Sequence, residues 1–342
     1  MEKWKLPLVF FLTVLFHGCA GIYSVVDFEV LEPATVSFPD GDGHLLVLMR
    51  APISMDAFSE ENRTNLDNKQ LVILDTLIIN SICRGLQEVL EQSPIKRFHT
   101  PLWMSERRLD TAYLEDLILT RREVDSWCNI WGGDVLISLE FYSLDLDDST
   151  IYYSDAPMEV QTHYYEVSNK VHWNIYLPGS PRPFDRYTTV DTLFYPTIQN
   201  GQFQLAPSYT FMIRDAFFTS GKKYGRYLVP VWSEASRILY KGKGDSLKLA
   251  SKHTGKGEWD EAFNIWKALL VSEDSTIVAK SLNNMAIFYE LEDNLDSASL
   301  LVNRALEYDT LEIVRLYRDE LDTRIQNRKD VIKQVGEGQG ER

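Results

Sequence analysis

Residues 246–270 read SLKLASKHTGKGEWDEAFNIWKALL, and residues 282–306 read LNNMAIFYELEDNLDSASLLVNRAL, a related pattern at a constant offset of 36 positions. This offset aligns Ala250, Gly257, Ala262, Trp266 and Leu269 with Ala286, Asp293, Ala298, Val302 and Ala305. Small residues are needed where paired helices approach most closely, and large apolar residues fill the wider gaps. A repeat of this length predicts two stacked helical hairpins.

The pattern over residues 246–308 resembles tetratricopeptide repeats, whose period is about 34 residues. Gly257 stands at the expected turn of the first repeat, whereas the second repeat has Asp293 and Asn294 there. Residues 310–328 read as a charged helix with apolar positions that can cover the open end of the stack. We expect two repeats and a capping helix over residues 245–332, and a flexible tail at 333–342.

The resemblance to tetratricopeptide repeats also implies a binding surface, because the first helix of each pair lines a concave face in such repeats. The residues that this face would offer are Lys280, Asn283, Ile287, Glu290 and Leu291. The Lys and Arg cluster that captures a peptide carboxylate in some relatives is missing, so we do not expect that mode of binding. Two interpretations stay open: the hairpins bind a partner, or they only brace the rest of the chain.

The N-terminus has the layout of a secretory signal peptide. Lys3 and Lys5 precede an apolar run at residues 6–16. A run of about eleven residues forms roughly 16 Å of helix, too short to span a hydrocarbon core of about 30 Å. The segment is therefore expected to be removed rather than to stay in the membrane.

A lipid anchor is implied by the residues that follow this run. Gly18 and Cys19 resemble the end of the lipobox of bacterial lipoproteins, in which a small residue precedes the lipidated cysteine; Phe16 and His17 depart from the usual residues. The resemblance implies removal of residues 1–18 and attachment of lipid to Cys19. Acyl chains bury many CH₂ groups, which gives stable anchoring without a spanning helix.

The composition indicates a folded and acidic protein. Of its 342 residues, 44% are hydrophobic and 25% are charged, and the formal net charge is −15. Nucleic acids are bound by clustered Lys and Arg, so no nucleic-acid partner is expected. The expected partners are the membrane, through the lipid, and another protein.

Residues 19–244 are expected to form an α+β fold, a mixed α/β layer domain, ahead of the all-α hairpin array. The predicted strands are residues 23–30, 34–38, 44–50, 134–144, 158–167, 170–177 and 186–195, with a hairpin turn at Ser168 and Asn169. The predicted helices are residues 65–91, 111–130 and 208–240. This order of elements is similar to envelope domains of the curli-secretion lipoprotein type, a similarity of layout that does not transfer function.

The whole chain resembles a family of Bacteroidota lipoproteins in which an α/β body precedes C-terminal tetratricopeptide repeats. The residues that carry the resemblance are Cys19, the strand at residues 45–49, the segment 133–139 and the run 257–266. The resemblance implies location and architecture, and it implies no activity.

No motif of catalysis or metal binding is found. A helical zinc site needs two His at i and i+4, and the six His are scattered. His163 and His172 could be cross-strand neighbours of a hairpin, and we expect exposed strand residues there. Asp145, Asp147 and Asp148 could hold Ca²⁺, but a solvated turn is the expected structure. We therefore expect no metal, no cofactor and no catalytic residue.

These observations predict a non-enzymatic, lipid-anchored envelope protein that acts as a protein–protein adaptor or scaffold through its repeats. Residues 20–23 lack an acidic cluster resembling a surface-export signal, which favours the outer membrane facing the periplasm. The alternative is a hydrolase or glycan-binding protein with a site in residues 19–244 and repeats that are only structural. A disulfide between Cys83 and Cys128 stays open, because either thiol could equally be a small buried apolar group.

Overall fold

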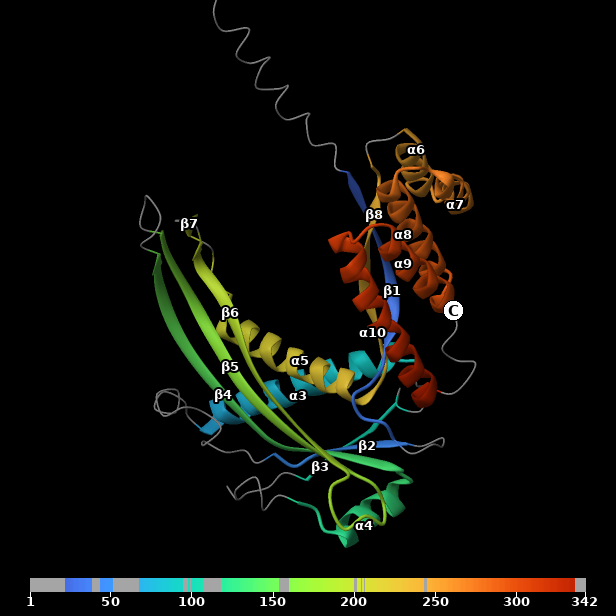
Figure 1. Cartoon of the computed structure of the whole chain (residues 1–342). Helices are drawn as coiled ribbons and strands as arrows, with labels where there is room; N and C mark the ends of the chain where they lie inside the picture. Colours follow the sequence, from blue (N-terminus) through green and yellow to red (C-terminus); the bar gives the residue numbers. More distant parts are fainter. Residues whose placement is uncertain are drawn as a thin grey trace, which may run out of the picture. The chain divides into compact units, whose positions relative to one another are not determined.

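The computed structural model of the chain describes residues 22–38, 44–51, 68–94, 98, 100–106, 118–153, 160–199, 202–203, 205, 207–242 and 245–335. The described chain forms two compact units (Figure 1). The α/β unit contains residues 33–231 and the end of the last helix, and the helical unit contains the first strand and residues 232–330. No helix within these ranges is both long and apolar enough to span a membrane. Gly18 and Cys19 lie outside the described residues.

A mixed sheet of six strands, counted over the described residues, forms the frame of the α/β unit, in the order β3-β2-β4-β5-β6-β7. The strands are β2 (Leu45–Met49), β3 (Leu102–Ser105), β4 (Val135–Tyr153), β5 (Val160–Tyr176), β6 (Asp185–Gln199) and β7 (Gln202–Phe203). β2 pairs in parallel with both β3 and β4, whereas β4 to β7 pair in antiparallel fashion. The prediction of a mixed α/β layer domain is confirmed at this level.

Helices cover both faces of the parallel part of the sheet. They are α3 (Asn68–Gln92), α4 (Arg121–Trp131) and α5 (Tyr209–Leu228). β2 is apolar at every position because both of its faces are buried. Val47 and Met49 join the core that contains α3 and α5, whereas Leu46 and Leu48 pack with residues of α4. The connections through α3 and α4 therefore lie on opposite faces, the arrangement that right-handed crossovers give.

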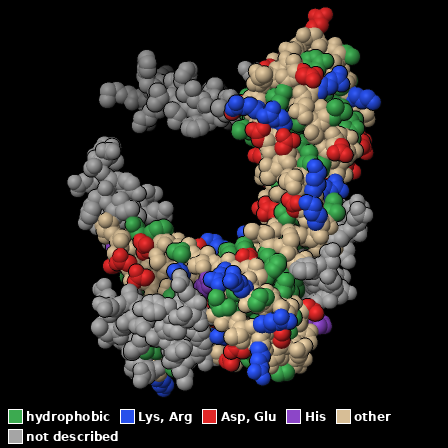
Figure 2. Space-filling model, turned by 60° about the horizontal axis from the view of Figure 1, so that its bottom comes forward, with side chains coloured by type: hydrophobic (Ala, Val, Ile, Leu, Met, Phe, Trp, Pro, Cys, Tyr) green, Lys and Arg blue, Asp and Glu red, His purple; other side chains and the backbone are tan. Residues whose placement is uncertain are grey.

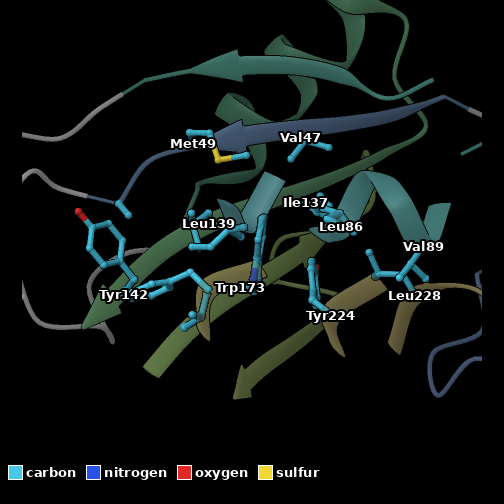
Figure 3. Close-up of a cluster of buried hydrophobic side chains, with 14 of the residues drawn as sticks. Val47, Met49, Leu86, Val89, Ile137, Leu139, Tyr142, Trp173, Tyr224 and Leu228 are labelled. Atoms are coloured by element: carbon cyan, nitrogen blue, oxygen red, sulfur yellow. The ribbon is translucent and has the colours of Figure 1, made fainter. Parts of the chain in front are cut away.

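The main core lies between the sheet and the helices α3 and α5 (Figure 3). The ring of Trp173 from β5 stacks on Tyr224 from α5, with centroids 4.4 Å apart. Leu86 of α3 and Ile137 of β4 have no exposed surface in the same cluster. Burying one such side chain contributes about 1.5–3 kcal/mol, so these contacts hold both helices on the sheet.

The helical unit consists of a two-stranded sheet and five α-helices, counted over the described residues. The elements are β1 (Tyr23–Glu32), β8 (Val231–Tyr240), α6 (Asp245–Thr254), α7 (Trp259–Ala268), α8 (Ser275–Leu291), α9 (Leu295–Tyr308) and α10 (Glu312–Val335), with a 3₁₀ turn at Leu269–Val271. α6 packs against α7, and α8 packs against α9. Ala250, Ala262, Ala286 and Ala298 are all fully buried, at the positions where the sequence repeat requires small residues.

The predicted helix at residues 208–240 is wrong in its second half. α5 ends at Leu228, and β8 begins at Val231. Pro230 has no amide hydrogen and disfavours a helical conformation of Val229, which is extended at φ −138° and ψ 149°. β8 is counted with the helical unit from Trp232 onward.

The predicted turn at Ser168 and Asn169 is also wrong, because both residues lie inside the continuous strand β5. Their side chains form hydrogen bonds with the neighbouring strand β6 and with the helix α5 that covers the sheet. Ser168 Oγ lies 2.8 Å from Thr192 Oγ1 on β6, and Ser220 of α5 donates to Asn169 Oδ1 at 3.1 Å. Polar residues that favour turns in isolation are thus held in a strand by tertiary contacts.

Two other segments differ from their predictions. Residues 34–38 form no strand, and the amides of Thr35 and Val36 both donate to the carbonyl oxygen of Tyr227 at 3.1 Å. α4 begins at Arg121, where Thr120 and Glu123 form a capping box. Residues 118–120 of the predicted helix are not helical, and residues 111–117 lie outside the described residues.

Candidate functional site

A pocket of about 430 Å³ lies between α3 and α5, within the range of about 300–1,000 Å³ that is common for small-molecule sites. One face of each helix lines it, at the spacing i, i+3, i+4 and i+7. The lining residues are Leu77, Asn80, Ser81 and Arg84 from α3 and Phe211, Arg214, Asp215 and Phe218 from α5. We call this site the α3–α5 pocket.

Glycines beside the lining residues set how closely the two helices approach. A Cβ atom at Gly85 would lie 2.1 Å from the carbonyl oxygen of Phe218, and one at Gly221 would lie 2.2 Å from the carbonyl oxygen of Ile82. A side chain at either position would have to displace helix backbone. The pocket walls are therefore fixed by direct backbone contact between α3 and α5.

The charged groups of the α3–α5 pocket are two arginines and one aspartate. Arg84 and Arg214 are exposed, and neither guanidinium has a carboxylate partner within the part of the chain that the structure describes. Asp215 accepts a hydrogen bond from the Tyr195 hydroxyl at 2.8 Å. Burial and the neighbouring carboxylate raise the pKa of Tyr195, so its hydroxyl stays protonated and donates. The two guanidinium groups are therefore available to an external anion.

A second pocket, of about 530 Å³, lies between α3 and the strands β2 and β3. Its lining residues are Met49, Ile79, Asn80, Cys83, Arg84, Gln87, Trp103, Met104 and Ser105. Asn80 and Arg84 line both pockets. Burial raises the pKa of the Cys83 thiol to about 12. The thiol is therefore neutral near pH 7 and is suited neither to nucleophilic attack nor to binding a metal as a thiolate.

Cys83 and Cys128 are not joined by a disulfide. Cys83 packs against the main core on the α3 side of the sheet, and Cys128 lies in the cluster on the α4 side. Both are free thiols. Burial also raises the pKa of Cys128, to about 11. The two residues behave as small buried apolar groups, which is one of the two possibilities that the sequence leaves open.

A buried ion pair that the sequence analysis missed lies where β2 ends. Arg50 Nη1 is 2.8 Å from Glu140 Oε1 and 3.0 Å from Oε2, and Glu140 has no exposed surface. Glu140 stands at the irregularity in register between Leu139 and Phe141, a type of bulge that re-aims side chains. A single Arg after an apolar strand and a single Glu within one carry no sequence signal of pairing.

The groove predicted on the hairpins is not open. Asn283, Ile287 and Glu290 are all buried, whereas Lys280 and Leu291 are half-buried. The side-chain amide of Asn283 donates to the carbonyl oxygen of Ile238 on β8 at 3.3 Å. β8 therefore covers the face of α8 that was expected to receive a partner.

β8 is held on α8 by side chains that bind its backbone and its arginine. Asn284 accepts from the amide of Tyr240 and donates to the carbonyl oxygen of Tyr240, each at 2.9 Å, as a neighbouring strand would do. The carboxylate of Glu290 accepts from Nε and Nη2 of Arg237, each at 2.9 Å. Arg324 of α10 lies 2.8 Å from the same carboxylate. The buried charge of Glu290 is thus neutralised by the chain itself.

The predicted metal candidates are not brought together. His163 and His172 lie on the same strand, β5, and are not cross-strand neighbours. Each has a threonine partner, with Nδ1 2.6 Å from Thr197 Oγ1 and 2.7 Å from Thr188 Oγ1, respectively. No cluster of three or more His, Cys, Asp or Glu side chains suited to a metal occurs within the described ranges. The aspartates at 145, 147 and 148 lie within β4, not in a turn.

Charged side chains of both signs are mixed on the surface drawn in Figure 2, where Lys and Arg lie among Asp and Glu. Among the described residues drawn on this face, Lys and Arg do not form one patch separate from Asp and Glu, as a surface that binds a nucleic-acid backbone would.

Comparisons with known proteins match most of the chain to two families that are described only as domains of unknown function. No curated protein matches the chain. One solved structure, that of a homolog of neuraminyllactose-binding hemagglutinin from Helicobacter pylori, is similar with 11% identity and a TM-score of 0.31, over 58% of this chain and 86% of that one. A similarity this weak carries no argument. Residues 248–323 match the family model Domain of unknown function DUF6340. Residues 46–240, more than half of the chain, match the family model Domain of unknown function DUF8603, and the chain belongs to that family.

Proposed function

We propose that this chain is a non-enzymatic envelope protein, anchored through a lipid on Cys19, that acts by binding a partner at the α3–α5 pocket. The observation that carries the proposal is the pocket itself, with Arg84 and Arg214 unpaired within the described ranges beside exposed Phe211. The signal-peptide layout and the lipobox resemblance support an envelope location, on the periplasmic side of the outer membrane.

In this proposal the two hairpins, which resemble tetratricopeptide repeats, bind the chain's own strand β8 and not an external partner. Such repeats hold a peptide on the first helices of their pairs. Here the contacts of Asn283, Asn284 and Glu290 with β8 support the idea that the chain's own strand takes that position. The repeats then act as the structural brace that the sequence left open, and the binding role moves to the α/β unit.

The lining of the pockets favours binding over hydrolysis. Acid–base cleavage of a glycosidic bond uses a pair of carboxylates on either side of the scissile bond. Among the described residues that line the two pockets, Asp215 is the single carboxylate, and it is held by Tyr195. Cys83 is a neutral thiol. This chemistry supports recognition of a partner and offers no catalytic pair.

The proposal can be tested with a photo-reactive residue placed in the pocket. Benzoylphenylalanine would replace Asn80, which lines both pockets, and in a matched protein it would replace Asn303, an exposed asparagine of α9. After irradiation of living cells, we expect an adduct of defined mass at position 80 that disappears when Arg84 and Arg214 are changed to Glu. Adducts at position 303 and none at position 80 would contradict the proposal and return the binding role to the helical unit.

The anchor has its own test. We expect Cys19→Ser to release the protein from the membrane fraction, because the proposed covalent attachment to lipid would be lost. An unchanged membrane fraction would contradict anchoring through this cysteine. The outcome is independent of the result at the pocket.

A further inference from the structure

We propose that the ligand of the α3–α5 pocket is an anionic amphiphile, in which a phosphate monoester or carboxylate is carried on an apolar chain. This inference rests on the proposed function and names the class of ligand. Arg84 and Arg214 bind the anion, and Leu77, Phe211 and Phe218 contact the apolar chain.

The two arginines supply the selection for charge. A guanidinium group presents several N–H donors in a planar fork that matches phosphate and carboxylate oxygens. The chain has a net charge of −15, so it repels anions at long range, and two guanidiniums without carboxylate partners in the described structure form a local exception. A nearby cation, Lys222, does not contribute, because it is paired with Glu88 at 2.8 Å.

The single acid of the pocket does not cancel this attraction. The carboxylate of Asp215 is turned to the Tyr195 hydroxyl, which donates to it at 2.8 Å. A hydrogen bond of this kind disperses part of the negative charge. The formal charge of the lining is then two positive groups against one hydrogen-bonded carboxylate.

The walls supply the selection for an apolar chain. Phe211 is 51% exposed although it lines a pocket. Covering exposed apolar surface is favourable by roughly 25 cal/mol per Å². A bare anion such as inorganic phosphate would leave Phe211 and Phe218 uncovered, whereas an alkyl phosphate would cover them. The two selections together define an amphiphile.

The pocket is formed before a ligand arrives. The contacts at Gly85 and Gly221 fix the separation of α3 and α5, so ligand entry requires no opening of the helix pair. Pre-formed sites lose little free energy to reorganisation on binding. The ligand is thus expected to bind without a change in helical content.

The test is titration calorimetry of the full mature chain with octyl phosphate. We expect saturable binding to the wild type. In the double variant Arg84→Ala, Arg214→Ala we expect binding about tenfold weaker or worse, because a charge-assisted hydrogen bond is lost at each of the two sites. The matched control is Arg226→Ala, Arg304→Ala, two exposed arginines outside the pocket, the first on the same helix α5. The control is expected to bind as the wild type does, and equal circular dichroism spectra check that both variants fold.

Three further probes separate the chemical features of the ligand. Octyltrimethylammonium has the chain without the anion, and inorganic phosphate has the anion without the chain; we expect both to bind about tenfold more weakly or worse. Octanoate is expected to bind, since a carboxylate also fits the guanidinium fork. No binding of octyl phosphate, or equal binding by the arginine variant, would overturn the inference.

Vesicles distinguish a membrane from a free amphiphile. Binding of anionic phospholipid vesicles without binding of monomeric octyl phosphate would overturn the pocket assignment and indicate a membrane contact. A specific crosslink at position 80 with no binding of octyl phosphate would overturn the ligand class and leave the proposed function standing. The two failures are therefore distinguishable.

Discussion

The guanidinium of Arg237 and the carboxylate of Glu290 form a two-point ion pair, with Nε and Nη2 each 2.9 Å from a carboxylate oxygen. Glu290 has no exposed surface, and Arg237 is 8% exposed. The pair joins β8 to α8 within the helical unit. It explains why the face of α8 that resembles a peptide groove is already filled.

Breaking this pair is expected to destabilise the helical unit strongly. Arg237→Ala leaves part of the buried charge of Glu290 uncompensated, and such losses cost about 3–5 kcal/mol. The measurement is denaturant unfolding of the protein. In the matched variant Glu320→Ala, the removed carboxylate also binds Arg237 but is 57% exposed, so we expect a cost of about 0–1 kcal/mol. Equal costs for the two variants would contradict the role given to the buried pair.

The side-chain amide of Asn284 is also expected to stabilise the helical unit, because it joins β8 to α8 through uncharged hydrogen bonds. Asn284→Ala removes both partners of the Tyr240 backbone, and each buried polar group left unpaired costs about 1–3 kcal/mol. Asn303→Ala removes an exposed amide that bonds within α9, so a change within about 0.5 kcal/mol is expected. The free energy of unfolding is measured for both variants. Equal values would contradict the stabilising role given to the hydrogen bonds between Asn284 and the backbone of β8.

Close approach of α3 and α5 gives a third prediction. Gly221→Ala places a methyl group 2.2 Å from the carbonyl oxygen of Ile82, and such overpacking costs about 1–3 kcal/mol or more. At Gly255 the nearest atom to a new Cβ is 3.5 Å away, so Gly255→Ala is expected to leave thermal stability nearly unchanged. A Gly221→Ala protein as stable as the wild type would show that the helices can separate freely.

Alkaline pH is expected to weaken the α/β unit through Cys83. Burial raises its pKa from 9.0 to about 12, so the unfolded chain ionises this thiol at a lower pH than the folded chain does. The contribution to stability is therefore fully present below about pH 9 and is lost as the pH rises to about 12. Urea midpoints between about pH 8 and pH 11 should fall more steeply for the wild type than for Cys83→Ala. Parallel pH curves would contradict burial of this thiol in the folded state.

The elements that could be predicted are those with a strong local period. The repeat through Ala250 and Ala286 predicts helix pairs because small residues recur where helices touch, and the apolar run Leu45–Met49 predicts a strand buried on both faces. Val231–Tyr240 was predicted as helix because a weak apolar pattern continued past Pro230. Its identity as a strand depends on pairing with β1 and on contacts with Asn284 and Glu290, all of which lie far from it along the chain.

The α3–α5 pocket could not be predicted for a similar reason. The spacing of Leu77, Ser81 and Arg84 reads as one face of a helix, and the same holds for Phe211 and Phe218. Neither sequence segment contains a signal that these two helix faces pack against each other. The closest available signal is the glycine at 85 and the pair at 221 and 225, small residues within helical segments, which point to close helix packing but not to the identity of the partner helix.

The most direct measurement of ligand binding at the pocket uses fluorine resonance at two phenylalanines of similar exposure. Phe211 of the pocket is 51% exposed, and Phe194 of β6 is 58% exposed outside it. With 4-fluorophenylalanine at one position or the other, titration with octyl phosphate is predicted to shift the resonance at Phe211 to saturation and to leave Phe194 unchanged. A silent Phe211, or equal shifts at both positions, would contradict binding at the α3–α5 pocket.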